Sequence, residues 1–213
     1  MTSPPGLKYG QYYHIYNRGN NREDIFVQER NYRHFLALYA RHVQPAADTY
    51  AYCLLRNHFH LLVRVKTVEE QKAEADPLTA MAQAPGVSPT FTPKRPSQQF
   101  GNLFNAYAKA FNRAYRRTGS LFQHPFGRVM VTSDAHFQAL VSYIHRNPQK
   151  HGFVDDFREW PYSSYHAIVA VQPTRIRRHE VLAWFGGQAG FQASHEGPVD
   201  ERRVATLVPG DLY

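Results

Sequence analysis

Two histidines, His58 and His60, stand two positions apart in the apolar run RNHFHLLVRV. Such a run is typical of a β-strand, in which alternate side chains point to the same side of the sheet. Both imidazoles should therefore project together while Phe59 points to the other side. Two imidazoles so placed can share a metal ion. The chain has 12 histidines in 213 residues, so a chance pair of exposed histidines on a sheet is the competing interpretation of this pattern.

The second pair of interest is Tyr143 and Asn147, in the segment YIHRNPQKHGFV near the end of a predicted helix. Residues four apart share one face of a helix, so a phenol and an amide oxygen would point the same way. A phenol can act as a nucleophile, and an amide oxygen can bind a metal ion. The chain has 14 tyrosines, and the alternative for Tyr143 is a half-buried ring that closes the core.

Together the two pairs predict a metal site with a phenol beside it, which neither pair predicts alone. His58, His60 and Asn147 are ligand types that hold Mg²⁺ or Mn²⁺ with open coordination positions, and a phenol would lie beside them. A divalent ion next to a nucleophilic oxygen is suited to phosphodiester chemistry. The sequence thus predicts a metal-assisted reaction at a phosphodiester, with the phenol of Tyr143 beside the metal ion.

These residues require a sheet and a helix to position them. Strands are predicted over residues 12–16, 49–54, 58–65 and 126–131, the middle two forming a hairpin. An amphipathic helix is predicted over 31–43, a long one from Ser97 to Gly119, and one capped by Thr132 or Ser133 and ended by Pro148. The order β-α-β-β-α-β followed by a further helix predicts an α+β, ferredoxin-like antiparallel sheet with two helices on one face.

The predicted catalytic domain covers residues 1–170, and residues 171–213 form an extension with a short helix near 179–185 and a Gly-rich tail. Between residues 66 and 96 the composition changes to Ala, Pro, Glu, Gln and Thr, with neither helical nor strand periodicity sustained. We expect a surface insertion there.

The composition favours a polyanionic partner. Lys and Arg number 25 against 17 Asp and Glu, a formal net charge of +8. Cationic side chains gain affinity for nucleic acids by releasing the counterions condensed on phosphates, and unpaired bases can stack on aromatic rings. One cysteine, Cys53, excludes an intramolecular disulfide and a Cys-rich zinc site. No apolar run reaches membrane-spanning length and the N-terminus lacks the order of a signal peptide, so a cytoplasmic protein is expected.

A basic stripe is predicted on the long helix, opposite its apolar face. A solvated helix face is the ordinary explanation of such a stripe; the alternative is that it follows a nucleic-acid backbone. The Gly/Asn-rich turn after the first strand adds further cations that could contact a DNA hairpin. The predicted DNA-binding residues are Lys109, Arg113, Arg116 and Arg117 on the helix, with Arg18 and Arg22 at the turn.

In four segments the sequence resembles the REP-associated tyrosine transposases, a group within the HUH single-tyrosine transposases. The segments are NHFHLLVRV, GSLFQHPFGRVMV, YIHRNPQKHGFV and WPYSSY, in matching order across about residues 9–168. The resemblance implies that Tyr143 is the nucleophile and that His58, His60 and Asn147 hold Mg²⁺ or Mn²⁺. The long 66–96 stretch departs from the pattern, and the resemblance is loose beyond Arg175.

The resemblance further implies a bacterial enzyme that cleaves and joins single-stranded DNA through a 5′-phosphotyrosine intermediate. Its substrate would be hairpin or palindromic repeat DNA, and it would act at the nucleoid as a monomer or homodimer. The alternatives are a relaxase-like nicking enzyme and a non-catalytic DNA-binding regulator that retains the fold. A ferredoxin-like RNA-binding module is disfavoured, because NHFHLLVRV lacks the aromatic pattern of that class.

Overall fold

Two central strands, β1 (Tyr12–Arg18) and β3 (His58–Val65), pair antiparallel from Tyr12 opposite Arg64 to Arg18 opposite His58. Strand β2 (Ala47–Leu54) lies on the outer side of β3, and β4 (Gly127–Val131) lies beside β1. The resulting order is β2-β3-β1-β4, with every pair antiparallel. This computed structural model describes residues 6–80, 91–197 and 201–208.

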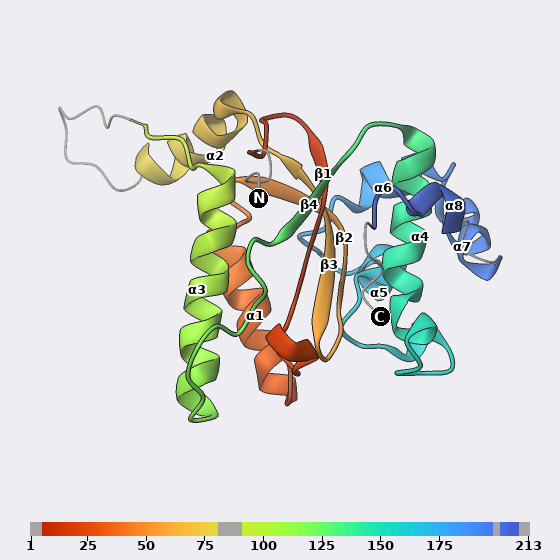
Figure 1. The fold of residues 1–213 in the computed structure, drawn as a ribbon. Coiled ribbons are helices and arrows are strands. Elements are labelled where there is room, and N and C mark those ends of the chain that lie inside the picture. The colour runs from red at the N-terminus through yellow and green to blue at the C-terminus, as the bar shows by residue number, and fades with distance from the viewer. Residues whose placement is uncertain (1–5, 81–90, 198–200, 209–213) are drawn as a thin grey trace.

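One face of the sheet is covered by α1 (Glu29–His42) and α3 (Pro96–Ala114), which lie side by side (Figure 1). Both helices direct aromatic and aliphatic side chains at the strand residues of that face, and burial of this apolar surface is what holds the layers together. The buried cluster includes Ile15 and Phe59 from the sheet, Phe35 from α1, and Leu103 and Tyr107 from α3.

The opposite face is covered by α4 (Asp134–Lys150), alone among the long helices (Figure 1). It begins at the N-cap Ser133, whose hydroxyl accepts a hydrogen bond from the His136 backbone N–H. Leu140, Val141 and Ile144 pack there against strand residues such as Leu62. The predicted α+β, ferredoxin-like sheet with two helices on one face and a further helix is confirmed.

The C-terminal part of the chain packs around α4. It is more helical than the predicted short helix and Gly-rich tail, because residues 188–196 also form a helix. Among the described residues, no helix combines the length and apolar content needed to cross a bilayer. The elements are a 3-10 turn at Phe157–Glu159 and helices α5 (Tyr165–Val169), α6 (Arg178–Trp184), α7 (Gln188–Glu196) and α8 (Glu201–Val204).

Three boundaries differ from the sequence-based expectation. Helix α2 (Val68–Ala80) forms within the stretch expected to lack periodicity, because charged residues and alanines sustain a helix that has little apolar stripe. Pro148 lies inside α4 instead of ending it, and the helix continues to Lys150. Helix α3 ends at Ala114, so the chain from Tyr115 to Gly119 is not helical. Residues 81–90 of the expected insertion lie outside the described residues.

Candidate metal and nucleophile site

His58 and His60 lie on the α4 face of the sheet, as their spacing predicts. Their exposed fractions are 1% and 0%, so they are buried groups and not the exposed pair of the competing interpretation. Phe59 points to the opposite face, into the cluster beneath α1 and α3. Burying imidazoles in this way is unfavourable unless their ring nitrogens find partners.

Helix α4 brings Tyr143 against His60 and Asn147 against His58. The ring centroids of Tyr143 and His60 are 5.6 Å apart, and Asn147 Oδ1 lies 3.2 Å from His58 Nε2. Two residues along a strand advance about 6.7 Å, and four residues along a helix advance about 6 Å. One helical turn therefore matches the His-x-His spacing, and the two predicted pairs meet as one site.

Tyr143 is 2% exposed and packs in the cluster that contains Val204, Leu207 and Val208. Burial by itself is also what a purely structural tyrosine would have, as the alternative for this residue states. Its ring also meets His60 edge-on, and the Lys150 ammonium lies 5.3 Å from its ring centroid.

Two other buried or half-buried tyrosines, Tyr107 and Tyr115, lie on the opposite side of the sheet. The Tyr107 hydroxyl donates to the Ile25 carbonyl at 2.5 Å, and the Tyr115 hydroxyl donates to Asn31 Oδ1 at 2.9 Å. Both rings pack with the α1 and α3 cluster. Neither phenol is therefore placed to act beside His58 and His60.

The tautomer of each of the two histidines depends on the partners of its ring nitrogens. His58 Nδ1 lies 2.7 Å from Asn57 Oδ1, and His58 Nε2 lies 3.2 Å from Asn147 Oδ1. Both partners are amide oxygens, which only accept, and a neutral imidazole has one N–H, so the ring donates to one of them at a time. When it donates to Asn57, the shorter contact, Nε2 and the Asn147 oxygen are two acceptor atoms 3.2 Å apart, close to the separation of about 3 Å between adjacent ligands of an octahedral Mg²⁺.

His60 is linked in the same way to a histidine that the sequence did not single out. His60 Nδ1 lies 2.9 Å from Nε2 of His14, and His14 Nδ1 lies 2.7 Å from the carbonyl of Leu207. Burial lowers the pKa of His14 to about 4, and burial together with the neighbouring histidines holds the pKa of His60 well below its usual value. Both rings are therefore neutral at pH 7, the state that a metal ligand requires.

Two buried polar atoms at this site have no hydrogen-bond partner within the described part of the chain. They are His60 Nε2 and Asn147 Nδ2. A buried polar atom left unpaired costs about 1 to 3 kcal/mol, and a cation would satisfy the imidazole nitrogen. The donor set of His58, His60 and Asn147 thus fits a divalent ion. In the described residues, no cluster of three or more His, Cys, Asp or Glu is placed to hold a metal ion, and the donor set of this site contains the Asn147 amide.

Arg18 is the predicted DNA-binding residue that lies at the site. It stands opposite His58 in the β1–β3 register, on the same face of the sheet, and is 7% exposed. Burial, with a smaller contribution from the nearby Arg22 charge, lowers the pKa of this guanidinium. A buried cation beside the histidines is well placed to meet an anionic group.

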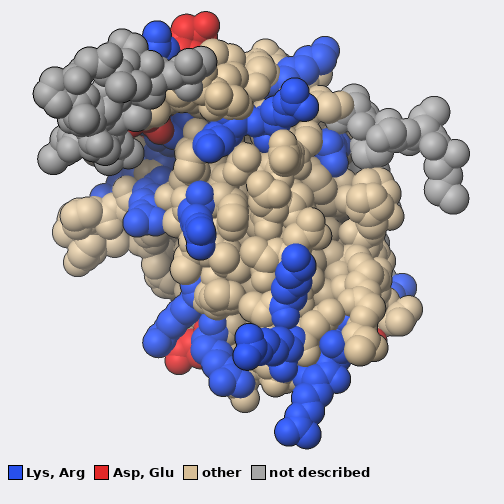
Figure 2. Space-filling model, turned by 90° about the vertical axis from the view of Figure 1, so that its left-hand side faces the viewer, with Lys and Arg blue, Asp and Glu red and all other residues tan. Residues whose placement is uncertain are grey.

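The remaining predicted cations gather near the same end of the molecule. The end of α3 and the 3-10 turn at Asn20–Arg22 lie at the lower end of the view in Figure 1, as does the C-terminal end of α4. Lys109 and Arg113 are exposed on α3, whereas Arg116 and Arg117 follow the helix and Arg117 is paired with Glu23 at 2.5 Å. The single helical stripe is thus wrong for Arg116 and Arg117. On the face in Figure 2, blue Lys and Arg side chains outweigh the red acidic ones.

Tyr16 is a further ring on the face of the metal residues. Its centroid lies 6.3 Å from that of His60, and burial raises the pKa of its phenol. The ring rests on Gly127 of β4, where an added Cβ would come within 2.2 Å of ring atoms. The glycine in GRVMV therefore leaves the space that this ring occupies.

A second buried histidine pair lies on the outer side of α4. His145 Nδ1 is 2.9 Å from His195 Nε2, and His195 Nδ1 is 2.7 Å from the carbonyl of Phe191. The other end is closed, because His145 Nε2 lies 2.8 Å from the Ser164 hydroxyl, which also accepts the Tyr52 backbone N–H at 2.8 Å. Ser164 belongs to the WPYSSY segment, which is thereby tied to both α4 and β2.

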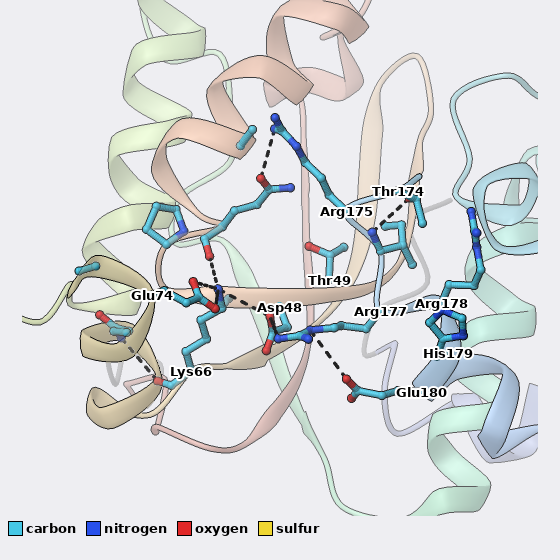
Figure 3. A pocket seen from close by; sticks show the side chains of 17 residues that line it. Asp48, Thr49, Lys66, Glu74, Thr174, Arg175, Arg177, Arg178, His179 and Glu180 are labelled. Carbon is cyan, nitrogen blue, oxygen red and sulfur yellow. Dashed lines mark hydrogen bonds and ion pairs between the residues drawn. The ribbon is translucent and has the colours of Figure 1, made fainter. Parts of the chain in front are cut away.

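The structure also has a charged cavity of about 790 Å³ at the other end of β3, between α2 and residues 174–180 (Figure 3). Its principal cations already have carboxylate partners. Lys66 Nζ lies 2.6 Å from Glu74, and Arg177 lies 2.8 Å from Asp48 (Figure 3). Arg175 and Arg178 also line it, and they bond to the Gln44 side-chain oxygen and to backbone carbonyls. The cavity contains none of the four residues His58, His60, Tyr143 and Asn147.

Fold and site together define a ferredoxin-like α+β domain with a His-x-His strand facing a Tyr-x-x-x-Asn helix. No family model matches the chain. A solved structure, described as a REP-associated tyrosine transposase bound to a REP hairpin, has the same fold with a TM-score of 0.54. The match covers 81% of this chain and 88% of that chain at 20% sequence identity.

The sequence comparison leads to the same group. A Haemophilus influenzae protein provisionally named a REP-associated tyrosine transposase is 28% identical over 125 residues, which are 59% of this chain. The match spans 62% of that relative's length. The resemblance to REP-associated tyrosine transposases that the sequence predicted is therefore confirmed in sequence and in fold.

Proposed function

We propose that this protein cleaves and rejoins single-stranded DNA, with Tyr143 as the nucleophile and His58, His60 and Asn147 as ligands of Mg²⁺ or Mn²⁺. The observation that carries the proposal is the pairing of Tyr143 with His60 and of Asn147 with His58 across one helical turn. The similarity to a transposase solved with a REP hairpin supports hairpin or palindromic repeat DNA as the substrate.

In this mechanism the phenol oxygen of Tyr143 attacks the scissile phosphorus in line. A bond from that oxygen to phosphorus forms as the bond from phosphorus to the 3′ oxygen breaks. The phenol proton passes to solvent, and the departing 3′ oxygen takes a proton from solvent. The products are a 5′-phosphotyrosyl link and a free 3′-hydroxyl. Because one phosphodiester is exchanged for another, a second 3′-hydroxyl can reverse the step and join strands without ATP.

The surrounding residues have separate roles. A bound divalent ion would draw charge from a non-bridging phosphate oxygen, since a phenol with an ordinary pKa near 10 attacks poorly without such help. Arg18 would hold a second phosphate oxygen from the β1 side. Lys150, whose ammonium lies 5.3 Å from the Tyr143 ring centroid, would favour the ionised phenol.

DNA would reach the site along the cationic end of the molecule. Arg22 lies in the turn that follows β1, and Arg113 lies in the last turn of α3. A strand bound there would pass Arg18 before reaching His58. Contacts of this kind position a backbone without reading its sequence, so binding should weaken as salt rises.

The test is the covalent adduct formed with a hairpin oligonucleotide that carries unpaired flanks and a 3′ label, in Mn²⁺. Tyr143→Phe should abolish the adduct and leave hairpin affinity and thermal stability close to wild type, because only the buried phenol oxygen is removed. Tyr107→Phe and Tyr115→Phe are controls whose hydroxyls lie on the other side of the sheet.

Tyr16→Phe is the sharpest comparison, since this phenol is on the same face as His60. An adduct that survives Tyr143→Phe and disappears in Tyr16→Phe would move the nucleophile to β1. A wild-type protein that binds the hairpin tightly yet forms no adduct in Mn²⁺ would favour the non-catalytic regulator instead.

A further inference from the structure

We propose that His14 is a positioning residue that fixes His60 in the tautomer with a bare Nε2, the form that binds a metal ion. The inference rests on the proposed function, because it assumes that His60 is a ligand. It assigns a role to a residue of β1 that touches neither the metal nor the DNA.

The direction of the hydrogen bonds carries the argument. A backbone carbonyl can only accept, so the carbonyl of Leu207, at 2.7 Å, requires a hydrogen on His14 Nδ1. A neutral imidazole has one N–H, so His14 Nε2 is bare and must accept. The partner at 2.9 Å, His60 Nδ1, then has to donate, and His60 Nε2 is left with its lone pair.

The end of this chain of bonds agrees with the inference. His60 Nε2 is the atom that has no hydrogen-bond partner among the described residues, and it belongs to a side chain with 0% exposure. His14 is equally buried, at 0%, so water does not compete for its nitrogens. The ring planes of His14 and His60 are inclined by only 18°, so their hydrogen bond fixes the orientation of both rings.

His58, the other proposed ligand, does not depend on a residue from another strand. His58 Nδ1 lies 2.7 Å from the side-chain oxygen of its own neighbour, Asn57, which accepts. Metal-binding histidines generally donate their second N–H to a carbonyl or carboxylate, and loss of that partner weakens metal binding about 10- to 100-fold. For His60 the partner is an imidazole, which serves only because Leu207 fixes its tautomer.

The experiment compares three variants in the full-length protein. His14→Phe keeps a planar ring but has no acceptor, His14→Gln restores an acceptor oxygen, and His195→Phe removes the same kind of histidine pair elsewhere. The Mn²⁺ dissociation constant, measured by titration without DNA, should rise about 10- to 100-fold in His14→Phe. It should recover in part in His14→Gln and stay at the wild-type value in His195→Phe.

A second readout reports the tautomer itself. Long-range ¹H–¹⁵N spectra of the metal-free protein should give His60 as the Nδ1–H form in wild type and as a mixture of tautomers in His14→Phe. Wild-type Mn²⁺ affinity in a folded His14→Phe, or an Nε2–H form of His60 in the wild type, would overturn the inference. If His14→Phe does not fold, the wild-type spectrum and His14→Gln decide.

The two proposals fail separately. A wild-type protein that binds no Mn²⁺ would refute the metal site of the proposed function, and the metal-free spectrum would still test the role of His14. A normal metal site with an unchanged His60 tautomer in His14→Phe would refute only the role of His14.

Discussion

Two buried histidine pairs, His14–His60 and His145–His195, lie on the two sides of α4. They differ in whether the last ring nitrogen of the pair has a hydrogen-bond partner. Each begins at a backbone carbonyl of the C-terminal extension, Leu207 for His14 and Phe191 for His195. The pair on the outer side is closed by the Ser164 hydroxyl, whereas the pair facing the sheet ends in the bare His60 Nε2. Buried polar groups are normally satisfied, and the open end at His60 is where we propose that a metal ion binds.

The largest contrast is expected from removing one histidine of each pair. His60→Ala should lower Mn²⁺-dependent cleavage by about 1,000-fold or more, the equivalent of the several kcal/mol that a metal ion contributes. His145→Ala should instead lower the free energy of unfolding by about 2 to 4 kcal/mol, because it leaves a cavity and unpaired groups in the core.

Adduct yield and urea unfolding, each measured on both variants below their melting temperatures, give the comparison. A folded His145→Ala protein that had lost its dependence on Mn²⁺ would contradict the separation of the two pairs. So would a His60→Ala protein that still cleaved at the wild-type rate.

Acid should destabilise the protein through both pairs alike. Burial lowers the pKa of His195 to about 4, so between pH 6.5 and pH 4 the unfolded chain binds a proton that the folded chain does not. Stability is then fully present above pH 6.5 and falls as the pH drops toward 4, by about 3 kcal/mol for this group. His14 has the same lowered pKa, so acid sensitivity does not distinguish the pairs.

Urea unfolding at a series of pH values tests this. His195→Phe should be less stable than wild type at pH 7, yet its stability should fall less steeply from pH 6.5 to pH 4. A parallel pH dependence in wild type and His195→Phe would mean that His195 is not held neutral by burial.

The sequence predicted those parts of the site in which spacing along one element decides the geometry. His-x-His follows from strand alternation and Tyr-x-x-x-Asn from the helical repeat, so His58, His60, Tyr143 and Asn147 could be named together. His14 could not, because it is a lone histidine among tyrosines and its role depends on a strand pairing 46 residues away. The Leu207 contribution is a backbone carbonyl, which no side-chain pattern reveals.

The errors in the fold have similar causes. Helix α2 has almost no apolar face to generate a periodic signal. The predicted basic stripe continues past Ala114, where α3 ends, and Arg116 beyond it has a left-handed φ of 51°. The sequence predicts a helix end at Pro148, whereas α4 continues to Lys150. A proline inside a helix removes one backbone hydrogen bond, and the packing of α4 on both of its sides compensates for it here.

The smallest expected difference is between variants of Asn147, which lies beside the His14–His60 pair, and Ser164, which bonds to His145 of the other pair. Asn147→Ala removes the third proposed ligand, so Mn²⁺ affinity should fall by about tenfold or more while the free energy of unfolding changes by less than about 1 kcal/mol. Ser164→Ala leaves His145 Nε2 and the Tyr52 N–H unpaired, and should cost about 1 to 3 kcal/mol with unchanged Mn²⁺ affinity.

Calorimetric titration and thermal unfolding of the two variants would measure both quantities. The opposite result would be weaker Mn²⁺ binding in Ser164→Ala and a loss of stability in Asn147→Ala. It would assign the metal ion to the His145–His195 pair instead of the His14–His60 pair.

The match between one helical turn and two strand residues also bears on which changes of chain length the site tolerates. An insertion of one residue between Tyr143 and Asn147 would rotate one of them by about 100° away from the sheet, and one between His58 and His60 would turn a histidine to the opposite face. Between these two short stretches lies α2, which follows the end of β3 remote from His58 (Figure 1). We therefore expect divergent relatives to keep the two spacings and to differ in chain length at α2.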